Sequence, residues 1–176
     1  MCVYMYVHVC VHVLYISVQA FRVMNFVRHP VVAKASSLFI VCGLADGASQ
    51  VFFADPLNPE RSVRFALSGS LAVVPVLIAN TVLPPTSTVQ RIALEACVFG
   101  PMYLSSLLCW NAALAGKNPL NTVQKRFIPL YWDALRVVPV YNAVVWFAIA
   151  PHMRGYALTG CQFFWNIYVA WFVDKS

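Results

Sequence analysis

Residues 31–54 read VVAKASSLFIVCGLADGASQVFFA, an apolar run in which Lys34 and Asp46 are the only charged side chains. A helix needs about 20 predominantly apolar residues to cross a bilayer. This run is long enough, and it therefore predicts a membrane-spanning helix with one carboxylate in its interior. Such an ionisable group is costly in lipid and makes Asp46 a candidate functional residue.

Further apolar blocks follow along the chain, and they cover Ser62–Leu83, Thr88–Ala115, Leu135–Ala150 and Tyr156–Val173. Turn-forming segments separate them: DPLNPER at 55–61, PP at 84–85 and GKNP at 116–119. The mixed stretch 121–136 carries charges among aromatic residues, which suits an amphipathic helix at the membrane surface. We predict an all-α, multi-span transmembrane helical bundle with four membrane helices, and a fifth if 156–173 crosses.

Prolines stand inside these blocks at Pro75, Pro101, Pro129 and Pro139. A proline within a helix removes a backbone hydrogen bond and kinks the helix. Small residues recur at helical spacing, as in Gly43 and Gly47, and such stripes let membrane helices approach closely. We therefore expect a compact bundle whose helices are kinked by prolines.

The composition supports one integral membrane domain. The chain has 176 residues, of which 61% are hydrophobic and 10% charged, and its mean hydropathy is +0.71. Soluble domains are about 45–50% apolar and about 25% charged. These values exclude a soluble, disordered or fibrous protein.

The net charge of +6 comes from basic residues that are scattered between the apolar blocks. This pattern favours contact of basic loops with anionic membrane lipid over nucleic-acid binding. If successive loops lie on alternate sides of the membrane, five basic residues fall on each side. The distribution of basic residues therefore does not indicate how the chain is oriented in the membrane. One side takes Arg61, Arg64, Lys117, Lys125 and Arg126.

Residues 1–25 form an apolar N-terminal extension, ahead of a transmembrane domain that we place at 26–174. Alternating purines and pyrimidines can encode the first part of this extension, which suggests an origin in a dinucleotide repeat. Its His8, Cys10 and His12 are ligand types that zinc accepts. No fourth ligand is visible, so we favour the repeat over a zinc site. The extension resembles neither a signal peptide nor a transit peptide.

Motifs of catalysis are missing from the sequence: it has no G-x-S-x-G, P-loop, dinucleotide fingerprint or H-E-x-x-H. None of the six cysteines forms a C-x-x-C pair, and most lie in apolar runs as small hydrophobic residues. We therefore expect a non-enzymatic protein with no catalytic residue, no cofactor and no metal site.

Asp46 is the best sequence candidate for a pore or gate, because no basic residue lies close to it along the chain. Gln50 follows one helical turn later and can join Asp46 through a hydrogen bond. The alternative is that both residues hold helices together.

Two charged pairs have an obvious local partner. Arg91 and Glu95 are four residues apart, and Asp133 and Arg136 are three apart, so each pair shares a helix face. They can line a polar pathway or serve as paired ions that fix helices. We favour the second interpretation for both pairs.

Several landmarks occur in the order of one known membrane-protein family. The patterns are G-D-x-x-x-Q, R-T-x-R-x-x-x-x-G, K-x-x-x-D-Q-x-x-x-x-P, W-P, a late arginine and W-N-x-Y-x-x-W. Each pattern has a counterpart in this chain, and some positions carry a chemically similar residue in place of the family's own. In the same order, the counterparts are Asp46 and Gln50; Arg61, Ser62, Arg64 and Gly69; Arg91, Glu95 and Pro101; Pro139; Arg154; and Trp165, Asn166, Tyr168 and Trp171. Over about residues 26–174, the chain resembles the family of the Mpv-seventeen protein and the twenty-two-kilodalton peroxisomal membrane protein.

The chain departs from the family pattern mainly at polar positions. Ile78, Asn80 and Thr81 stand in place of H-x-W-Y, and Ala96 stands in place of the glutamine of D-Q. The resemblance implies a small multi-span organelle protein, and some members of the family look like channels. Because a pore needs a polar lining, the loss of polar groups favours a structural role.

The lead interpretation is an accessory or structural subunit of a larger, respiratory-type complex in the mitochondrial inner membrane. Its partners would be other membrane subunits and lipids, with contact or lipid surfaces at Trp165, Tyr168 and Trp171, together with Phe163 and Phe164. The alternative is a small-solute channel of the mitochondrial or peroxisomal membrane. Its pore, gating or helix-holding residues would be Asp46, Gln50, Arg61, Arg64, Arg91, Glu95 and Arg154.

Overall fold

A computed structural model describes residues 30–53 and 55–175, and within these ranges the chain is helical, with no strand. The helices are α2 (Pro30–Phe52), α3 (Pro59–Val82), α4 (Thr88–Leu94), the π-helix η1 (Glu95–Phe99), α5 (Gly100–Leu114), α6 (Pro119–Ala148), the 3-10 helix η2 (Pro151–Met153) and α7 (Arg154–Lys175). The predicted N-terminal extension, with His8, Cys10 and His12, lies outside the described residues.

Short polar side chains fix where the helices begin. The side chain of Asn58 accepts a hydrogen bond from the backbone N–H of Arg61, and Pro59 occupies the first turn of α3. Asn118 caps α6 in the same way ahead of Pro119. Proline is favoured in the first turn of a helix because backbone N–H groups there make no intrahelical hydrogen bond, so the N–H that proline lacks is not needed. The turn segments predicted at 55–61 and 116–119 therefore contain the actual starts of α3 and α6, whereas α4 begins at Thr88, after the predicted turn at 84–85.

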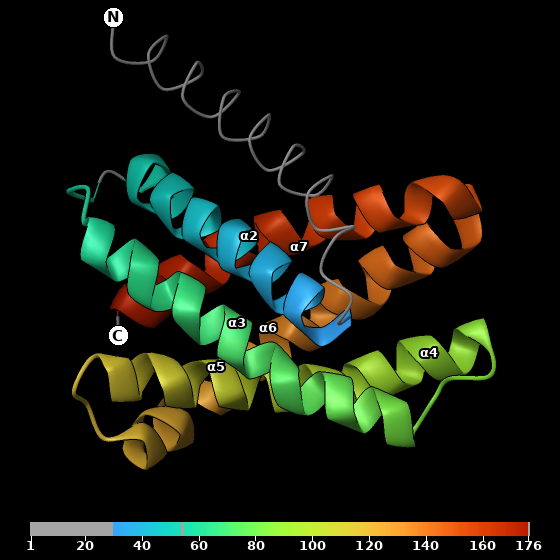
Figure 1. Ribbon diagram of the computed structural model, residues 1–176, viewed down its shortest axis with the longest axis horizontal. Helices are drawn as coiled ribbons and strands as arrows, with labels where there is room; N and C mark the ends of the chain where they lie inside the picture. The colour runs from blue at the N-terminus through green and yellow to red at the C-terminus, as the bar shows by residue number, and fades with distance from the viewer. Residues whose placement is uncertain (1–29, 54, 176) are drawn as a thin grey trace, which may run out of the picture.

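The helices form one closed bundle (Figure 1). Along the chain, α2 packs against α3, α3 against α5 and α5 against α6. The last helix, α7, packs against both α6 and α2, so the chain returns to its first described helix. Segments distant in sequence, the end of α2 and the end of α7, are thereby brought together.

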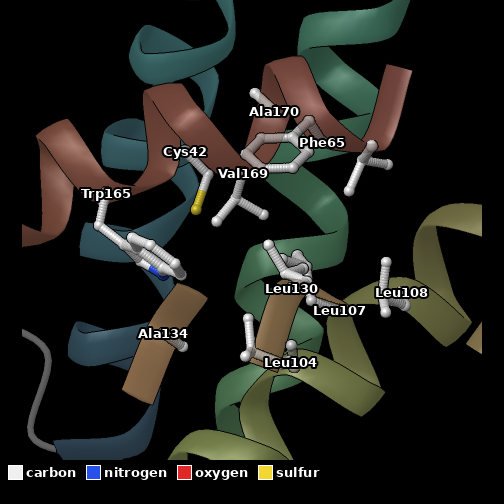
Figure 2. Close-up of a cluster of buried hydrophobic side chains, with 12 residues drawn as sticks. Cys42, Phe65, Leu104, Leu107, Leu108, Leu130, Ala134, Trp165, Val169 and Ala170 are labelled. Carbon is white, nitrogen blue, oxygen red and sulfur yellow. The ribbon is translucent and has the colours of Figure 1, made fainter. Parts of the chain in front are cut away.

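An apolar core lies where these helices meet (Figure 2). It contains the fully buried side chains of Leu107, Leu108 and Leu130 from α5 and α6, and Val169 from α7. A glycine allows α2 and α3 to approach at the edge of this core, because a Cβ at Gly69 would overlap the Sγ of Cys42.

Within the described residues, three helical segments are long and apolar enough to cross a membrane: Ala33–Phe52, Pro59–Val82 and Thr88–Leu114. The third is built from α4, η1 and α5. The fourth and fifth predicted spans lie in α6 and α7, which are not among these segments. Charged residues in the first half of α6, and Tyr, Trp, Asn and Gln side chains in α7, lower their hydropathy.

The structure differs from the sequence prediction in the region of α6. The surface helix expected at 121–136 and the span expected at 135–150 form one continuous helix of 30 residues. Pro129 and Pro139 lie inside it. A proline inside a helix need not end it, and here α6 packs against α5 and α7.

Candidate functional site

Polar side chains gather at opposite ends of the bundle. One group lies where α2 ends, α3 begins and α7 ends, toward the left of Figure 1. The other lines a cavity between segments that include the start of α2, α4 and η1, and the α6–α7 junction. Of these segments, α4 and the α6–α7 junction lie toward the right of that view. The apolar core of Figure 2 lies between them.

Asp46 is the centre of the first group and is only 1% exposed. Its Oδ1 accepts a hydrogen bond from Arg61 Nε at 2.9 Å. Its Oδ2 accepts from Ser62 Oγ at 2.8 Å and from Gln50 Nε2 at 2.5 Å. Both carboxylate oxygens are therefore engaged, as a buried charge requires.

Arg61 extends this network to a third helix. Its Nη1 lies 2.7 Å from Asp174 Oδ2 at the end of α7, and 3.6 Å from Asp55 Oδ2 in the α2–α3 turn. Its Nη2 donates to Ser49 Oγ at 3.2 Å. One guanidinium thus connects α2, α3 and α7.

Gln50 joins the same network to the turn after α2. Its Oε1 accepts a hydrogen bond from the backbone N–H of Asn58 at 2.5 Å, and its Nε2 donates to Ser62 Oγ at 3.0 Å. Asp46 and Gln50 therefore act as helix-holding groups in this conformation. The sequence pointed to Asp46 as a pore residue because it has no local partner, but Arg61 supplies one from the next helix.

The second group surrounds a cavity of about 380 Å³. Its ionisable lining residues include Lys34, Arg91 and Glu95. Hydroxyl and amide groups from α2, α6 and α7 also line it, namely Ser37, Tyr141, Asn142, Thr159 and Gln162. Apolar side chains such as Leu104 and Trp165 separate this cavity from the opposite end of the bundle. A space of this size fits a small solute.

Glu95 lies in the wall of the cavity at an irregular turn. The backbone N–H of Gly100 donates to the carbonyl of Glu95, which is the wide i to i+5 bond of a π-helix. A Cβ at Gly100 would lie 2.7 Å from that carbonyl oxygen, so this turn requires glycine. π-turns inside α-helices are frequent at functional sites.

The carboxylate of Glu95 makes no hydrogen bond or ion pair within the part of the chain that the structure describes. The positive charges of Lys34 and Arg91 act on it electrostatically without direct contact. The expected i, i+4 pair of Arg91 and Glu95 is therefore not closed. Glu95 remains available to a solute or water in the cavity.

Arg91 instead lies over an aromatic ring. Its guanidinium carbon is 4.7 Å from the centroid of Trp146, and that of Arg154 is 5.1 Å from the same centroid. Arg154 also donates from Nε to the carbonyl of Ile149 at 3.0 Å. Two guanidinium groups thus share one indole at the border of the cavity.

The second predicted pair, Asp133 and Arg136, is present as an ion pair of 3.6 Å on the surface of α6. Asp133 also accepts a hydrogen bond from the hydroxyl of Tyr168 at 2.5 Å. This contact joins α6 to α7 through Asp133, whereas the Arg136 side chain is 76% exposed.

The C-terminal aromatic residues lie mostly inside the bundle. Trp165 is 7% exposed, and Tyr168 is engaged with Asp133. Trp171 stacks on Phe53 with ring centroids 4.9 Å apart. Of the predicted contact surface, Phe164 is the residue that is strongly exposed, at 70%. Most of the aromatic side chains expected at the surface therefore pack within the bundle, and Phe164 remains exposed.

Sequence reasoning missed several site residues. Asn58, Asp55 and Asp174 join the Asp46 network from the turn and from the chain end. Asn58 had a usable signal, since an asparagine directly before a proline is typical of a helix start. Within the described residues, no group of three histidine, cysteine or acidic side chains could hold a metal ion.

Comparisons with protein-family models, with curated proteins and with solved structures find no match to this chain. The resemblance seen in the sequence motifs therefore stays a prediction.

Proposed function

We propose that the chain forms a pathway for small solutes across a membrane, as a channel or pore. The observation that carries this proposal is the open cavity of about 380 Å³ at one end of a bundle with three apolar, membrane-length helices. Charged and polar side chains in a membrane bundle mark solute or ion pathways, because leaving them in lipid is costly. Glu95 is the central residue, as its carboxylate faces the cavity without a direct partner in the described chain.

The described conformation corresponds to a closed pathway. Between the cavity and the opposite end lie the buried leucines of α5 and α6 and then the Asp46–Arg61 network. Opening would require these helices to move apart. The cavity itself would be the solute-binding part of the pathway.

We further propose that α6 and α7 cross the membrane together with the three apolar helices. α6 packs along α5, and α7 packs along α2, so both run beside membrane-length segments. Some of their polar residues line the cavity, for example Asn142 of α6 and Gln162 of α7. Polar groups that face a water-filled cavity do not exclude a helix from spanning.

The test is conductance of the purified full chain in planar bilayers. The wild-type chain should produce discrete conductance steps, and Glu95→Gln should change the reversal potential in a salt gradient. Glu60→Gln is the matched control, because Glu60 is exposed at the start of α3 and does not line the cavity. Absence of conductance, or equal behaviour of both variants, would contradict the proposal. Asp46→Asn is unsuitable here, since it disturbs a buried ion pair.

A second candidate is the accessory subunit of a larger membrane complex, and an exposed stripe on α6 favours it. Val137, Val140, Val144 and Phe147 follow helical spacing and are 46–68% exposed. α6 is not among the strongly apolar helices, so this stripe also suits a protein neighbour. Native electrophoresis of gently solubilised membranes tests this candidate. Migration of the chain as a monomer or small oligomer would argue against it.

For the location we propose the mitochondrial inner membrane, with the peroxisomal membrane as the alternative. This proposal rests on the resemblance in sequence motifs. Organelle fractionation tests which organelle holds the chain. Carbonate extraction of that fraction tests membrane integration, since an integral protein stays in the membrane pellet. Recovery with any other membrane fraction would overturn it.

A further inference from the structure

A small hollow of about 30 Å³ lies at the end of the bundle opposite the large cavity. Its walls come from the first turns of α3, the end of α5, the start of α6 and the end of α7. Arg61, Arg64, Lys117 and Arg126 line it, together with Asp46 and Asp174. These basic residues belong to segments far apart in sequence, and folding brings them together.

The acidic side chains of this hollow are already engaged. Asp46 and Asp174 both pair with Arg61, at 2.9 and 2.7 Å. Within the described residues, Arg64 and Lys117 have no carboxylate partner. The Nε of Arg64 is buried and makes no hydrogen bond in the structure. Because a buried donor without a partner is costly, it indicates that an acceptor is still to be supplied.

Arg126 adds a further positive charge, which pairs with no carboxylate among residues 30–53 and 55–175. It donates a hydrogen bond from Nη1 to the backbone carbonyl of Val173, near the end of α7. This contact holds the guanidinium at the edge of the hollow. Arg64, Lys117 and Arg126 therefore form a cluster of positive charge, which we call the basic cluster.

The basic cluster lies at one end of the three membrane-length segments. The first and third apolar segments end at Phe52 and Leu114, and the second begins at Pro59, so these ends meet on one side. Exposed apolar side chains flank the cluster along the chain: Val63 and Leu67 beside Arg64, and Leu114 and Leu120 beside Lys117. The basic groups match the charged headgroup of an anionic phospholipid, and the neighbouring apolar side chains match its acyl chains.

We propose that the basic cluster binds the phosphate of an anionic phospholipid headgroup. The hollow has room for about one water-sized group, so a phosphate oxygen can enter it while the rest of the headgroup stays at the mouth. Arg64 supplies its free Nε–H, and Lys117 and Arg126 supply charge. Guanidinium groups suit phosphate oxygens because their donors are fixed in a plane. This site is separate from the proposed solute cavity and does not depend on it.

The test is native mass spectrometry of the purified full chain in a neutral detergent, titrated with phosphatidylglycerol or with phosphatidylcholine. The wild-type chain should bind phosphatidylglycerol in preference. Lys117→Gln should weaken this binding about fivefold, the effect of one basic residue near a lipid surface. Lys125→Gln is the matched control, because Lys125 is exposed at the same end but does not line the hollow.

Arg64 provides the second arm. Arg64→Gln should weaken phosphatidylglycerol binding, and Arg64→Lys should restore only part of it, because lysine keeps the charge but lacks the Nε–H donor and the planar guanidinium. Equal losses in Lys117→Gln and Lys125→Gln would overturn the proposal, since they would indicate a diffuse charge effect. An absence of preference for phosphatidylglycerol over phosphatidylcholine would likewise overturn it.

Discussion

The Nε of Arg61 lies 2.9 Å from the Oδ1 of Asp46, and both side chains are buried although fifteen residues separate them. The contact joins the second half of α2 to the first turn of α3. It closes the end of the bundle that lies opposite the cavity. A buried pair of this kind is sensitive to the loss of either partner, because the remaining charge stays out of water.

Arg61→Met should therefore lower the free energy of unfolding by about 3–5 kcal/mol, the usual loss when one partner of a buried ion pair is removed. The measurement is thermal unfolding of the full chain in detergent micelles. Arg136→Met is the control, because the Arg136 side chain is 76% exposed in its ion pair with Asp133. Exposed pairs contribute about 0–1 kcal/mol. Similar losses in the two variants would contradict the assigned role of Arg61.

Much of the helical layout could be predicted because apolarity is a local property. The blocks at 31–54, 62–83 and 88–115 correspond to α2, α3 and the α4–α5 segment within a few residues. The π-turn at Glu95 could not be predicted, because it depends on the backbone contact between Gly100 and Glu95. The continuity of α6 was also missed, since it depends on packing against α5 and α7.

The site was predictable only where its residues are close in sequence. The hydrogen bond expected between Asp46 and Gln50 is present, because one helical turn places them on the same face. The partner Arg61 depends on how the α2–α3 turn directs α3 back along α2. The cavity depends on packing of many helices, so the sequence could suggest Glu95 as a lining residue but not the absence of its pairing with Arg91.

Gly69→Ala should destabilise the bundle by about 1–3 kcal/mol, as overpacking in a core does. The new Cβ would overlap Cys42 Sγ and lie 3.1 Å from Cys42 Cβ. Adding Cys42→Ala removes the sulfur and should restore part of the loss. Gly47→Ala is the control, because nothing lies within 4 Å of a Cβ at that position. The measurement is thermal unfolding of the wild-type chain, the two single variants and the double variant. An equal loss of stability in Gly47→Ala and Gly69→Ala would refute the close approach of α2 and α3 at Gly69.

Trp146→Leu should cost about 0.5–2 kcal/mol, because the guanidinium groups of Arg91 and Arg154 both lose an aromatic face. Trp132→Leu is the matched control, since Trp132 is 59% exposed and has no cation–π contact among the described residues. Chemical denaturation in micelles gives the comparison. If both tryptophan variants unfold alike, the paired arginines do not depend on the indole.

Tyr168→Phe should weaken the contact between α6 and α7, because the hydroxyl of Tyr168 donates to the carboxylate of Asp133 at 2.5 Å. Hydrogen bonds to charged groups contribute about 1.5–3 kcal/mol, and partial exposure of Asp133 places the expected loss near the lower end. Tyr131→Phe removes a hydroxyl that donates at 3.1 Å to the neutral carbonyl of Ala96, so its loss should be about 0.5–1.5 kcal/mol. Asp133→Asn supplies the decisive comparison, since it keeps the acceptor but removes the charge. Tyr168→Phe should then cost less in the Asp133→Asn background than in the wild-type chain, and equal costs in both backgrounds would show that the carboxylate charge does not strengthen this hydrogen bond.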